Sequence, residues 1–418
     1  MLNKTNNKKY IFSFIGSGIS SMFLLNEFLK NKELSSQSLF HIFEKDIFPF
    51  GLVRNGFAPD NYKTKENLSK LFIKNIKQNN VKYFGNVFIN NDNLKKISPN
   101  YSLIFSGNGL QKKRLLNIPN ENLMLDAIEL AKWYNGDIVE DKALKYTITN
   151  NKINNLIIIG NGNVSLDIIR ILFLIKYDLL YKYGVPEDRI KYIKKLRNKI
   201  KKIYIIGRNS IDNPSFTKFE FKNFLRHCIN CGNINIKIND MEIINKNNFY
   251  ISKKINFSHN SLTIKNNNDE NDSYKKKDII FLFNNIPIKY DGRYLYLKNN
   301  FNEDKIKSNI VIKSIGRDRQ DFIQINNLIK LPIYKNISEG FIYSKNLFEQ
   351  IMNQINQKLI KKYDIQKLNS YLEELKRKNK IIYKNDIFKI DEYEKREGNK
   401  KGKIRDKITE IKNVFKLL

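Results

Sequence analysis

The segment Tyr10–Ser21 reads YIFSFIGSGISS, and it decides the fold. Its first six residues are mostly apolar and predict a buried strand, which Gly16 and Gly18 follow directly. Residues Ile19–Leu29 then carry apolar side chains at helical spacing, and Leu39–Phe43 is a second short apolar run. Strand, glycine turn, helix and strand in this order predict a βαβ unit, whose glycines let a diphosphate approach the helix N-terminus.

A second unit of the same kind begins at Leu156–Ile159. Residues 160–164 read GNGNV and form a second candidate phosphate loop. A helix is predicted after it over Val164–Lys176, and a strand over Lys202–Ile206. The two units together predict an α/β fold with two Rossmann-like dinucleotide-binding domains.

Two charged residues lie where each unit would meet a ribose. Glu44 ends the second strand of the first unit, where a carboxylate accepts hydrogen bonds from ribose hydroxyls. Arg208 follows the corresponding strand of the second unit, where an Arg meets a 2′-phosphate and selects NADP over NAD. Two dinucleotide sites on one chain favour FAD plus NADP. Taken alone, each motif also has a simpler interpretation, an ordinary glycine turn or a surface Arg.

Composition excludes several classes of protein. The chain has 418 residues, of which 41% are hydrophobic, so it can build real cores and is not disordered throughout. Two cysteines cannot form a disulfide scaffold and indicate a reducing compartment. No apolar run is long enough to predict a transmembrane segment. With three histidines in all, a histidine-rich metal site is excluded, and we predict no metal.

The net charge of +33 would fit a nucleic-acid or anionic surface as a partner. The lysines are nevertheless spread along the whole chain among many asparagines, which is typical of compositional drift. A functional basic surface stays open as the alternative, but no nucleic-acid-binding motif is present, so we predict no specific nucleic acid. Cys228 and Cys231 form a C-x-x-C pair that we interpret as ordinary thiols rather than redox or zinc groups.

A family resemblance rests on motifs distributed along the chain. Residues 49–60 read PFGLVRNGFAPD and resemble the P-F-G-L-V-R-x-G-x-A-P-D-H signature of adrenodoxin-type ferredoxin–NADP reductases. Further matches follow in order: FGNV at 84–87, WYNG at 133–136, GNGNVSLD at 160–167, FT at 216–217 with Glu220, SIG at 314–316, then Asp386, Asp391, Glu394, Gly398 and GKIRDK at 402–407. The similarity covers nearly the whole chain, and its PFGLVR and WYNG elements are the specific ones.

The resemblance implies an NADP-binding domain inserted in an FAD-binding domain. Residues 1–9 would be a basic N-terminal segment and residues 10–109 the first part of the FAD domain. Residues 110–315 would form the NADP domain. This domain would contain a disordered excursion at 245–277, which the Asn, Lys and Ser content of those residues also predicts. Residues 316–418 would complete the FAD domain and add a charged helical extension.

The resemblance also implies the site residues, carried over by position. FAD contacts would be Gly16, Gly18, Ser20, Glu44, Leu52, Ile89, Ile333, Gly340, Phe341 and Ile342. NADP contacts would be Asn161, Gly162, Asn163, Val164, Arg208, Asn209, Glu220 and Gly340. Asp167 would be the catalytic residue.

The implied reaction is NADPH reduction of FAD, followed by single-electron transfer to a small acidic [2Fe–2S] ferredoxin. Its role would be iron–sulfur cluster assembly or related electron transport. The family implies the mitochondrial matrix. Because residues 1–9 form no clear transit peptide, the cytosol or another organelle stays open. The oligomeric state cannot be read from the sequence.

The chain departs from the family at the cofactor positions. The family's P-A-G after the first G-x-G is replaced by residues 19–21 (ISS), and its His after Pro-Asp is replaced by Asn61. The second Arg of its R-R pair is Asn209. A stretch is missing between Gly316 and Leu331, and the flavin-facing Trp position is Ile333, with Glu339 nearby. These departures leave an alternative open, a degenerate, non-catalytic relative that acts as a binding or scaffold protein.

Overall fold

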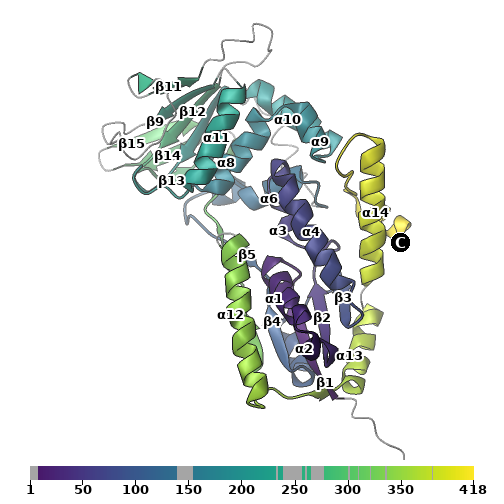
Figure 1. Cartoon of the computed structure of the whole chain (residues 1–418). Coiled ribbons are helices and arrows are strands. Elements are labelled where there is room, and N and C mark those ends of the chain that lie inside the picture. Colours follow the sequence, from purple (N-terminus) through teal and green to yellow (C-terminus); the bar gives the residue numbers. More distant parts are fainter. Residues whose placement is uncertain are drawn as a thin grey trace, which may run out of the picture.

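Two lobes, each built on a mostly parallel β-sheet, make up the described part of the chain (Figure 1). The structure is a computed structural model. It describes residues 8–138, 154–231, 234–238, 257–258, 261–264, 277–299, 302–308, 310–320, 322–334, 337–378 and 380–418. The predicted α/β fold with two dinucleotide-type sheets is therefore confirmed.

The sheet of the first lobe has the strand order β18-β4-β1-β2-β3, with all neighbours parallel. A short sixth strand, β19, pairs antiparallel with the start of β1. The strands are β1 (Lys8–Ile15), β2 (Ser38–Glu44), β3 (Val81–Gly85), β4 (Leu103–Ser106), β18 (Leu328–Lys330) and β19 (Tyr363–Asp364).

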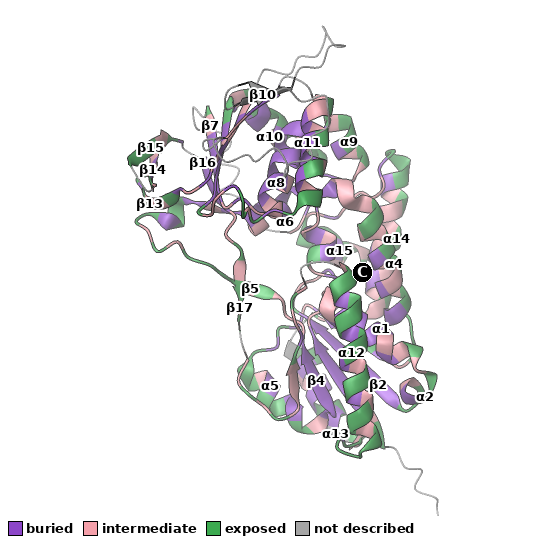
Figure 2. Cartoon of the chain, turned by 60° about the vertical axis from the view of Figure 1, so that its left-hand side comes forward, coloured by how far each residue is buried: buried purple, intermediate pink, exposed green. Residues whose placement is uncertain are grey.

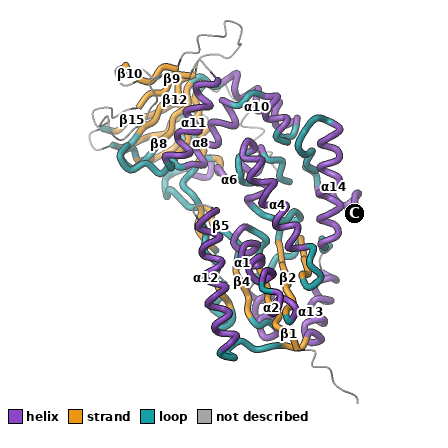
Figure 3. Tube along the Cα trace, viewed as in Figure 1, coloured by secondary structure: helices purple, strands orange, loops and turns teal. Residues whose placement is uncertain are grey.

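Alternating side chains of β1 explain why helices cover both faces of this sheet (Figure 3). Phe12 and Phe14 pack under α1 (Ile19–Lys30), α4 (Tyr62–Ile76) and α12 (Ile337–Asn356). Ile11 and Ile15 point to the opposite face, under α5 (Asn91–Ile97) and α13 (Ile365–Lys378). The remaining helices of this lobe are α2 (Lys32–Ser36), α3 (Leu52–Asn55), α14 (Lys384–Lys400) and α15 (Ile411–Leu417), with 3₁₀ turns at Pro59–Asn61 and Ser98–Asn100.

The second lobe has a larger sheet, in the order β10-β11-β9-β12-β8-β7-β16-β6. Its strands are β6 (Leu125–Asp126), β7 (Asn155–Ile159), β8 (Lys202–Ile206), β9 (Ile234–Ile238), β10 (Phe257–Ser258), β11 (Ser261–Ile264), β12 (Lys277–Leu282) and β16 (Ile310–Lys313). Only the β10-β11-β9 edge is antiparallel among these described strands.

Helices cover one face of this second sheet and a β-meander covers the other. The helices are α6 (Ala127–Tyr134), α8 (Asn163–Ile169), α9 (Tyr177–Lys182), α10 (Glu187–Lys199) and α11 (Lys218–Cys231). The meander consists of β13 (Ile286–Tyr290), β14 (Tyr294–Lys298) and β15 (Glu303–Lys307), and a 3₁₀ turn lies at Glu121–Leu123.

A two-stranded antiparallel ribbon carries the chain between the lobes (Figure 2). It pairs β5 (Leu110–Lys113), on the way into the second lobe, with β17 (Arg317–Arg319), on the way out. The second sheet thus lies within one insertion between β4 and β18 of the first. The domain boundaries predicted at 110 and 315 fall beside this ribbon and stay a prediction.

Local differences from the sequence-based expectation are small. The helix predicted over Val164–Lys176 is α8 followed by a π-helical turn, Arg170–Leu174, in which Ile175 N–H donates to the Arg170 carbonyl. The excursion expected to be disordered at 245–277 lies mostly outside the described residues. Its described parts are instead the strands β10 and β11 and the first residue of β12. No helix in the described ranges is long and apolar enough to cross a bilayer.

Candidate functional site

The first glycine turn joins β1 to α1 by a close approach to the loop after β4. Gly16 has a φ of +92°, and a Cβ there would lie 2.6 Å from the Gly107 carbonyl oxygen. Gly18 is the N-cap of α1 and supplies no side-chain cap. The first N–H groups of α1 therefore have no side-chain acceptor from their N-cap, and the helix dipole adds attraction for an anion.

The position of the family's third glycine shows a compensation that the sequence alone does not reveal. Ser21 is fully buried, and a Cβ at Gly107 would lie 2.0 Å from its hydroxyl oxygen. The side chain of Ser21 thus takes up the space beside residue 107, which must be glycine. Helix α1 and the sheet can pack closely here because residue 107 has no side chain to oppose Ser21.

This compensation makes a double substitution informative. Gly107→Ala is expected to lower the free energy of unfolding by about 1–3 kcal/mol, because the new methyl group overlaps Ser21. Adding Ser21→Gly should restore most of that loss, since the hydroxyl is removed. Urea denaturation of the two single variants and the double variant measures the coupling. Additive losses would show that the side chains at positions 21 and 107 do not compete for the same space.

Glu44 lies at the end of β2 with its carboxylate buried and already bonded within the chain. One oxygen accepts from the Ser17 N–H (2.8 Å) and hydroxyl (2.6 Å), and the other accepts from the Asp46 N–H (3.1 Å). Burial raises the pKa of Glu44. The Ser17 hydroxyl also accepts from the Phe50 N–H at 3.0 Å, so one serine joins the glycine turn, β2 and the PFGLVR segment.

The predicted FAD contacts divide into exposed and buried residues around this turn. Leu52 follows Gly51, where a Cβ would lie 4.0 Å from the Gly18 Cα, and Leu52 is 47% exposed. Ile333 and Ile342 are exposed as well, 45% and 63%. Ile89, in contrast, is buried in the core beneath β2 and β3. The exposed members leave apolar surface beside an anion-binding helix end.

The start of α12 packs tightly on α1. A Cβ at Gly340 would come within 3.0 Å of the Phe23 ring and 2.8 Å of Tyr334. Phe341 stacks on Phe23, with ring centroids 4.0 Å apart. The Ser20 hydroxyl donates to the Pro332 carbonyl at 2.8 Å, so the shortened segment before α12 is fixed to the first turn of α1. Despite the missing stretch, strand β18 still leads to helix α12.

The second glycine turn joins β7 to α8 in the same manner. Gly160 has a φ of +108°, and a Cβ there would lie 2.2 Å from the Ser314 carbonyl oxygen. Gly162 is an uncapped N-cap with nothing within 4 Å of a Cβ, so open space lies beside it. The Asn163 side chain accepts from the Thr217 N–H at 2.8 Å, which ties the FT motif to this turn.

Four other predicted NADP contacts lie nearby with different surroundings. Arg208 follows β8 and is exposed. Asn209 is partly buried, and its side-chain N–H donates to the Asn213 carbonyl at 3.3 Å. Glu220 lies in the first turn of α11, with a carboxylate oxygen 3.8 Å from Arg170. Val164 is partly buried in the first turn of α8.

The predicted catalytic residue Asp167 belongs to a buried cluster that links the lobes. Arg170 has no exposed side-chain surface and pairs with Asp60 of the first lobe at 2.6 Å and with Asp167 at 2.8 Å. Burial raises the pKa of Asp167 to about 7 against the opposing effect of Arg170. The charged partner of Asp167 is Arg170 and not residue 61, the Asn at the family's His position.

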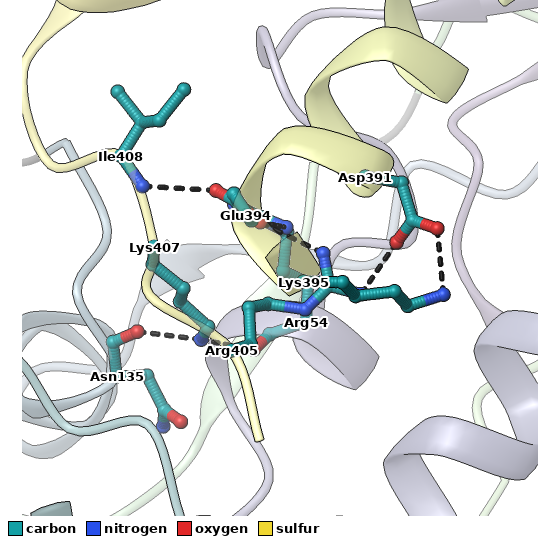
Figure 4. A network of polar contacts seen from close by, with 8 residues as sticks. All are labelled: Arg54, Asn135, Asp391, Glu394, Lys395, Arg405, Lys407 and Ile408. Carbon is teal, nitrogen blue, oxygen red and sulfur yellow. Dashed lines mark hydrogen bonds and ion pairs between the residues drawn. The ribbon is translucent and has the colours of Figure 1, made fainter. Parts of the chain in front are cut away.

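Behind the PFGLVR segment, residues from the C-terminus hold Arg54 (Figure 4). The carboxylate of Glu394 has no exposed surface and receives both terminal nitrogens of Arg54, at 2.6 and 3.0 Å. It also accepts from Arg405 at 2.8 Å. Lys407 donates to the carbonyls of Arg54 (3.1 Å) and Asn135 (2.6 Å). We call Glu394, Arg405 and Lys407 the C-terminal clamp; it joins three of the motifs.

His41 and the two cysteines have the surroundings of structural residues. His41 is fully buried, contacts the Tyr101 hydroxyl at 2.8 Å, and has a pKa lowered to about 3 by burial. Cys228 is buried, and Cys231 is the last residue of α11; both are free thiols. Across the described ranges, no group of His, Cys, Asp or Glu side chains is arranged to hold a metal ion.

Comparison with known proteins identifies relatives of this chain. A probable mitochondrial NADPH:adrenodoxin oxidoreductase of Dictyostelium discoideum is 30% identical over 258 residues, which are 60% of this chain and 47% of that protein. The Bos taurus mitochondrial NADPH:adrenodoxin oxidoreductase is 29% identical over 215 residues, 51% of this chain and 42% of its own length. The chain is a homologue of the adrenodoxin reductase and FprA family.

The fold of this adrenodoxin reductase homologue matches a solved family structure over its whole length. Mycobacterium tuberculosis FprA in complex with NADPH superposes with a TM-score of 0.77 at 21% identity, covering 98% of this chain and 99% of that one. The sequence matches span about half the length of the curated relatives. No family model matches the chain.

Sequence reasoning missed several residues that the structure brings into this site. They are Ser17, Gly107, Tyr334, Arg170 and the partners of Arg54 in the C-terminal clamp. The residues of the C-terminal clamp match the family motif in the sequence, but the sequence does not indicate what they contact. A charged Arg within the otherwise apolar run Ile168–Ile175 was the available signal for a buried ion pair.

Proposed function

We propose that the chain is an NADPH-dependent flavoprotein reductase that passes electrons through FAD to a small acidic [2Fe–2S] ferredoxin. One observation carries the proposal: each lobe has its own strand–glycine–helix turn with an uncapped helix N-terminus. Two such sites on one chain fit two dinucleotides. The names of the relatives, NADPH:adrenodoxin oxidoreductase and NADPH-ferredoxin reductase, support the pairing and the class of acceptor.

The residues of the first lobe fit FAD. The uncapped N-terminus at Gly18 suits a diphosphate, and Leu52 and Ile333 offer exposed apolar surface for a flat ring. Glu44 has one oxygen bonded only to the Asp46 N–H, which leaves acceptor capacity for a ribose hydroxyl. When bound, FAD would accept a hydride and release electrons singly. Glu339, in the exposed first turn of α12, would stand at the edge of this site.

In the second lobe, the turn at residues 160–164 would bind the diphosphate of NADPH and Arg208 its 2′-phosphate. Buried Arg170 holds Asp167 and Asp60 together across the lobes and so orients the two sites toward one another. With a pKa of about 7, Asp167 would carry a proton in about half of the molecules at neutral pH. Its proposed catalytic part is that of a proton-holding group beside Arg170.

Absorption spectroscopy of the purified chain tests this function. We expect flavin bands that bleach when NADPH is added without oxygen. Absence of any flavin after gentle purification would overturn the reductase and favour a non-catalytic binding protein. Bound flavin without bleaching would place the defect in the second lobe, around Asn209. With a [2Fe–2S] ferredoxin as acceptor, turnover should fall as salt screens the +33 chain from an acidic partner.

Asn209→Arg tests the predicted 2′-phosphate contact. The substitution adds a second guanidinium beside Arg208, and a charge-assisted hydrogen bond is worth about 1–3 kcal/mol. We therefore expect NADPH to bind about ten- to a hundredfold more tightly, while NADH binding stays unchanged. Fluorescence titration of both nucleotides provides the measurement. Equal gains for NADPH and NADH would show that residue 209 does not face the 2′-phosphate.

A further inference from the structure

A cleft lies on the side of the PFGLVR segment away from the glycine turns. Its volume is about 250 Å³, and its walls come from α4, α14, the segment Phe48–Phe50 and the Tyr183–Gly184 turn of the second lobe. None of Gly16, Gly18 or Leu52 lines it. The cleft is therefore separate from both proposed dinucleotide sites.

The walls of the cleft are apolar with a group of cations at one side. The apolar lining includes Phe50, Val53, Ile73, Ile387, Ile390 and Ile404. The cations are Arg54, Lys65, Lys395, Arg405 and Lys407, and the acids are Glu66 and Asp391. A site of this composition combines a hydrophobic surface with an excess of positive charge.

Most of these charges are already paired. Asp391 receives Lys395 and Arg405, and buried Glu394 receives Arg54 and Arg405. Glu66 pairs with Lys70 on the outer surface of α4. The acids near the cleft are thus matched by cations other than Lys65 and Lys407.

Lys65 and Lys407 are held by neutral oxygens only. The Lys65 ammonium donates to the Phe57 carbonyl (3.2 Å) and to the Asn135 side chain (2.7 Å). Lys407 donates to two backbone carbonyls. Within the described ranges, neither ammonium has a carboxylate at ion-pair distance, and the buried Arg54 Nε–H has no acceptor. Two ammonium charges and one guanidinium donor therefore remain for an anion.

Burial and neighbouring cations make the charged forms of both lysines unfavourable. Burial together with the charges of Arg54 and Arg405 lowers the pKa of Lys65 to about 7, against a small opposing effect of Asp60. Burial and the neighbouring Lys65 lower the pKa of Lys407 well below its usual range. Keeping both lysines charged in the cleft therefore raises the electrostatic free energy of the protein. A bound anion would offset this increase.

We propose that this cleft binds a small amphipathic organic anion, a monocarboxylate whose head pairs with Lys65 and Lys407 and whose short apolar body packs against the isoleucines of α14. The cleft is slightly smaller than the roughly 300 Å³ at which pockets for drug-sized ligands begin, so the body is limited to a short chain or single ring. Because its walls come from both lobes, the bound anion stabilises their observed arrangement.

Calorimetric titration of the purified full chain tests the proposal with three probes. Hexanoate carries both head and body, 1-hexanol carries the body alone, and inorganic phosphate carries the charge alone. We expect saturable binding of hexanoate that is about tenfold or more tighter than that of either other probe. Equal binding of hexanol would overturn the anionic head, and equal binding of phosphate would overturn the apolar body. No binding of hexanoate would overturn the site.

A matched pair of variants on α4 locates the binding. Lys65→Met removes the ammonium at the cleft, while Lys63→Met removes an exposed ammonium of the same helix. Hexanoate should bind about tenfold or more weakly to Lys65→Met and normally to Lys63→Met. Equal affinities would place the carboxylate elsewhere. If Lys65→Met does not fold, as judged by circular dichroism, Lys407→Met and the comparison of probes on the unmodified chain decide the question. Neither readout depends on flavin or NADPH, so this proposal and the reductase function can fail separately.

Discussion

Replacing Glu394 by Gln is expected to lower the free energy of unfolding by about 3–5 kcal/mol. The carboxylate is inaccessible to solvent and bonds Arg54 at 2.6 and 3.0 Å, Arg405 at 2.8 Å and the Ile408 N–H at 2.9 Å. Gln keeps the shape but not the charge, so Arg54 would lose its carboxylate partner, while Arg405 would keep Asp391. The uncompensated charge of Arg54, rather than the lost hydrogen bonds, supplies most of the effect.

The matched control is Glu397→Gln, three residues further along α14. Its side chain is 22% exposed and pairs with Lys400 and Arg396 at the surface, so its loss should cost much less than that of Glu394. Urea denaturation of the two variants and the unmodified chain gives the comparison. Similar losses for the two would show that the C-terminal clamp contributes no more than a surface pair.

The same carboxylate predicts a pH dependence. The guanidinium groups of Arg54 and Arg405 lower the pKa of Glu394 from 4.5 to about 2, against the effect of burial. A lowered pKa stabilises the fold above the unfolded value, and this stabilisation is lost as the pH falls from 4.5 toward 2. The Gln variant should lack this part of the acid-induced loss. An unchanged slope in that range would contradict the assignment.

The second large effect concerns two glycines of one turn, which differ in their surroundings. Gly160→Ala should lower the free energy of unfolding by about 3 kcal/mol or more, because it combines a left-handed backbone with a Cβ 2.2 Å from the Ser314 carbonyl. Gly162→Ala should change it by less than about 0.5 kcal/mol, since its φ is −85° and open space lies around it.

The affinity for NADPH should show the opposite pattern to stability, because the substitution that leaves the fold stable should weaken NADPH binding. The Gly162→Ala methyl group takes the space through which a diphosphate would approach α8, so we expect about tenfold or weaker NADPH binding to a fully folded protein. Thermal unfolding and NADPH fluorescence titration measure the two properties. Unchanged affinity in Gly162→Ala would remove the diphosphate from this turn, and a stable Gly160→Ala would contradict the close packing on β16.

The sequence predicted both glycine turns because strand, turn and helix are local patterns. β8 has the predicted bounds, and β1 and β2 differ from prediction by one or two residues. The end of α8 was less predictable, since residues 168–175 are apolar at nearly every position and all are buried. Such a run has no periodicity from which a π-helical turn could be recognised.

Contacts between distant segments could not be derived from one sequence. Ser21 with Gly107, and Arg54 with Glu394, are pairs in which each residue has an ordinary local setting. Only the fold brings them together. The absence of a side chain at Gly107 explains how the first turn can carry Ser21 and still pack closely. The cofactor contacts carried over by position stay predictions.

The insertion of one lobe in the other also sets the order in which a newly synthesised chain can fold. Strands β1 to β4 leave the ribosome early, but their sheet and core require β18, Leu331 and α12. The inserted lobe has its described strands and its buried core within residues 124–313, apart from Ala58, so it can fold while synthesis continues. Until β18 and α12 have been synthesised, the phenylalanines of β1 and β2 lie exposed in the nascent chain. Exposed phenylalanines are natural binding sites for chaperones. The first strands made are among the last to be packed.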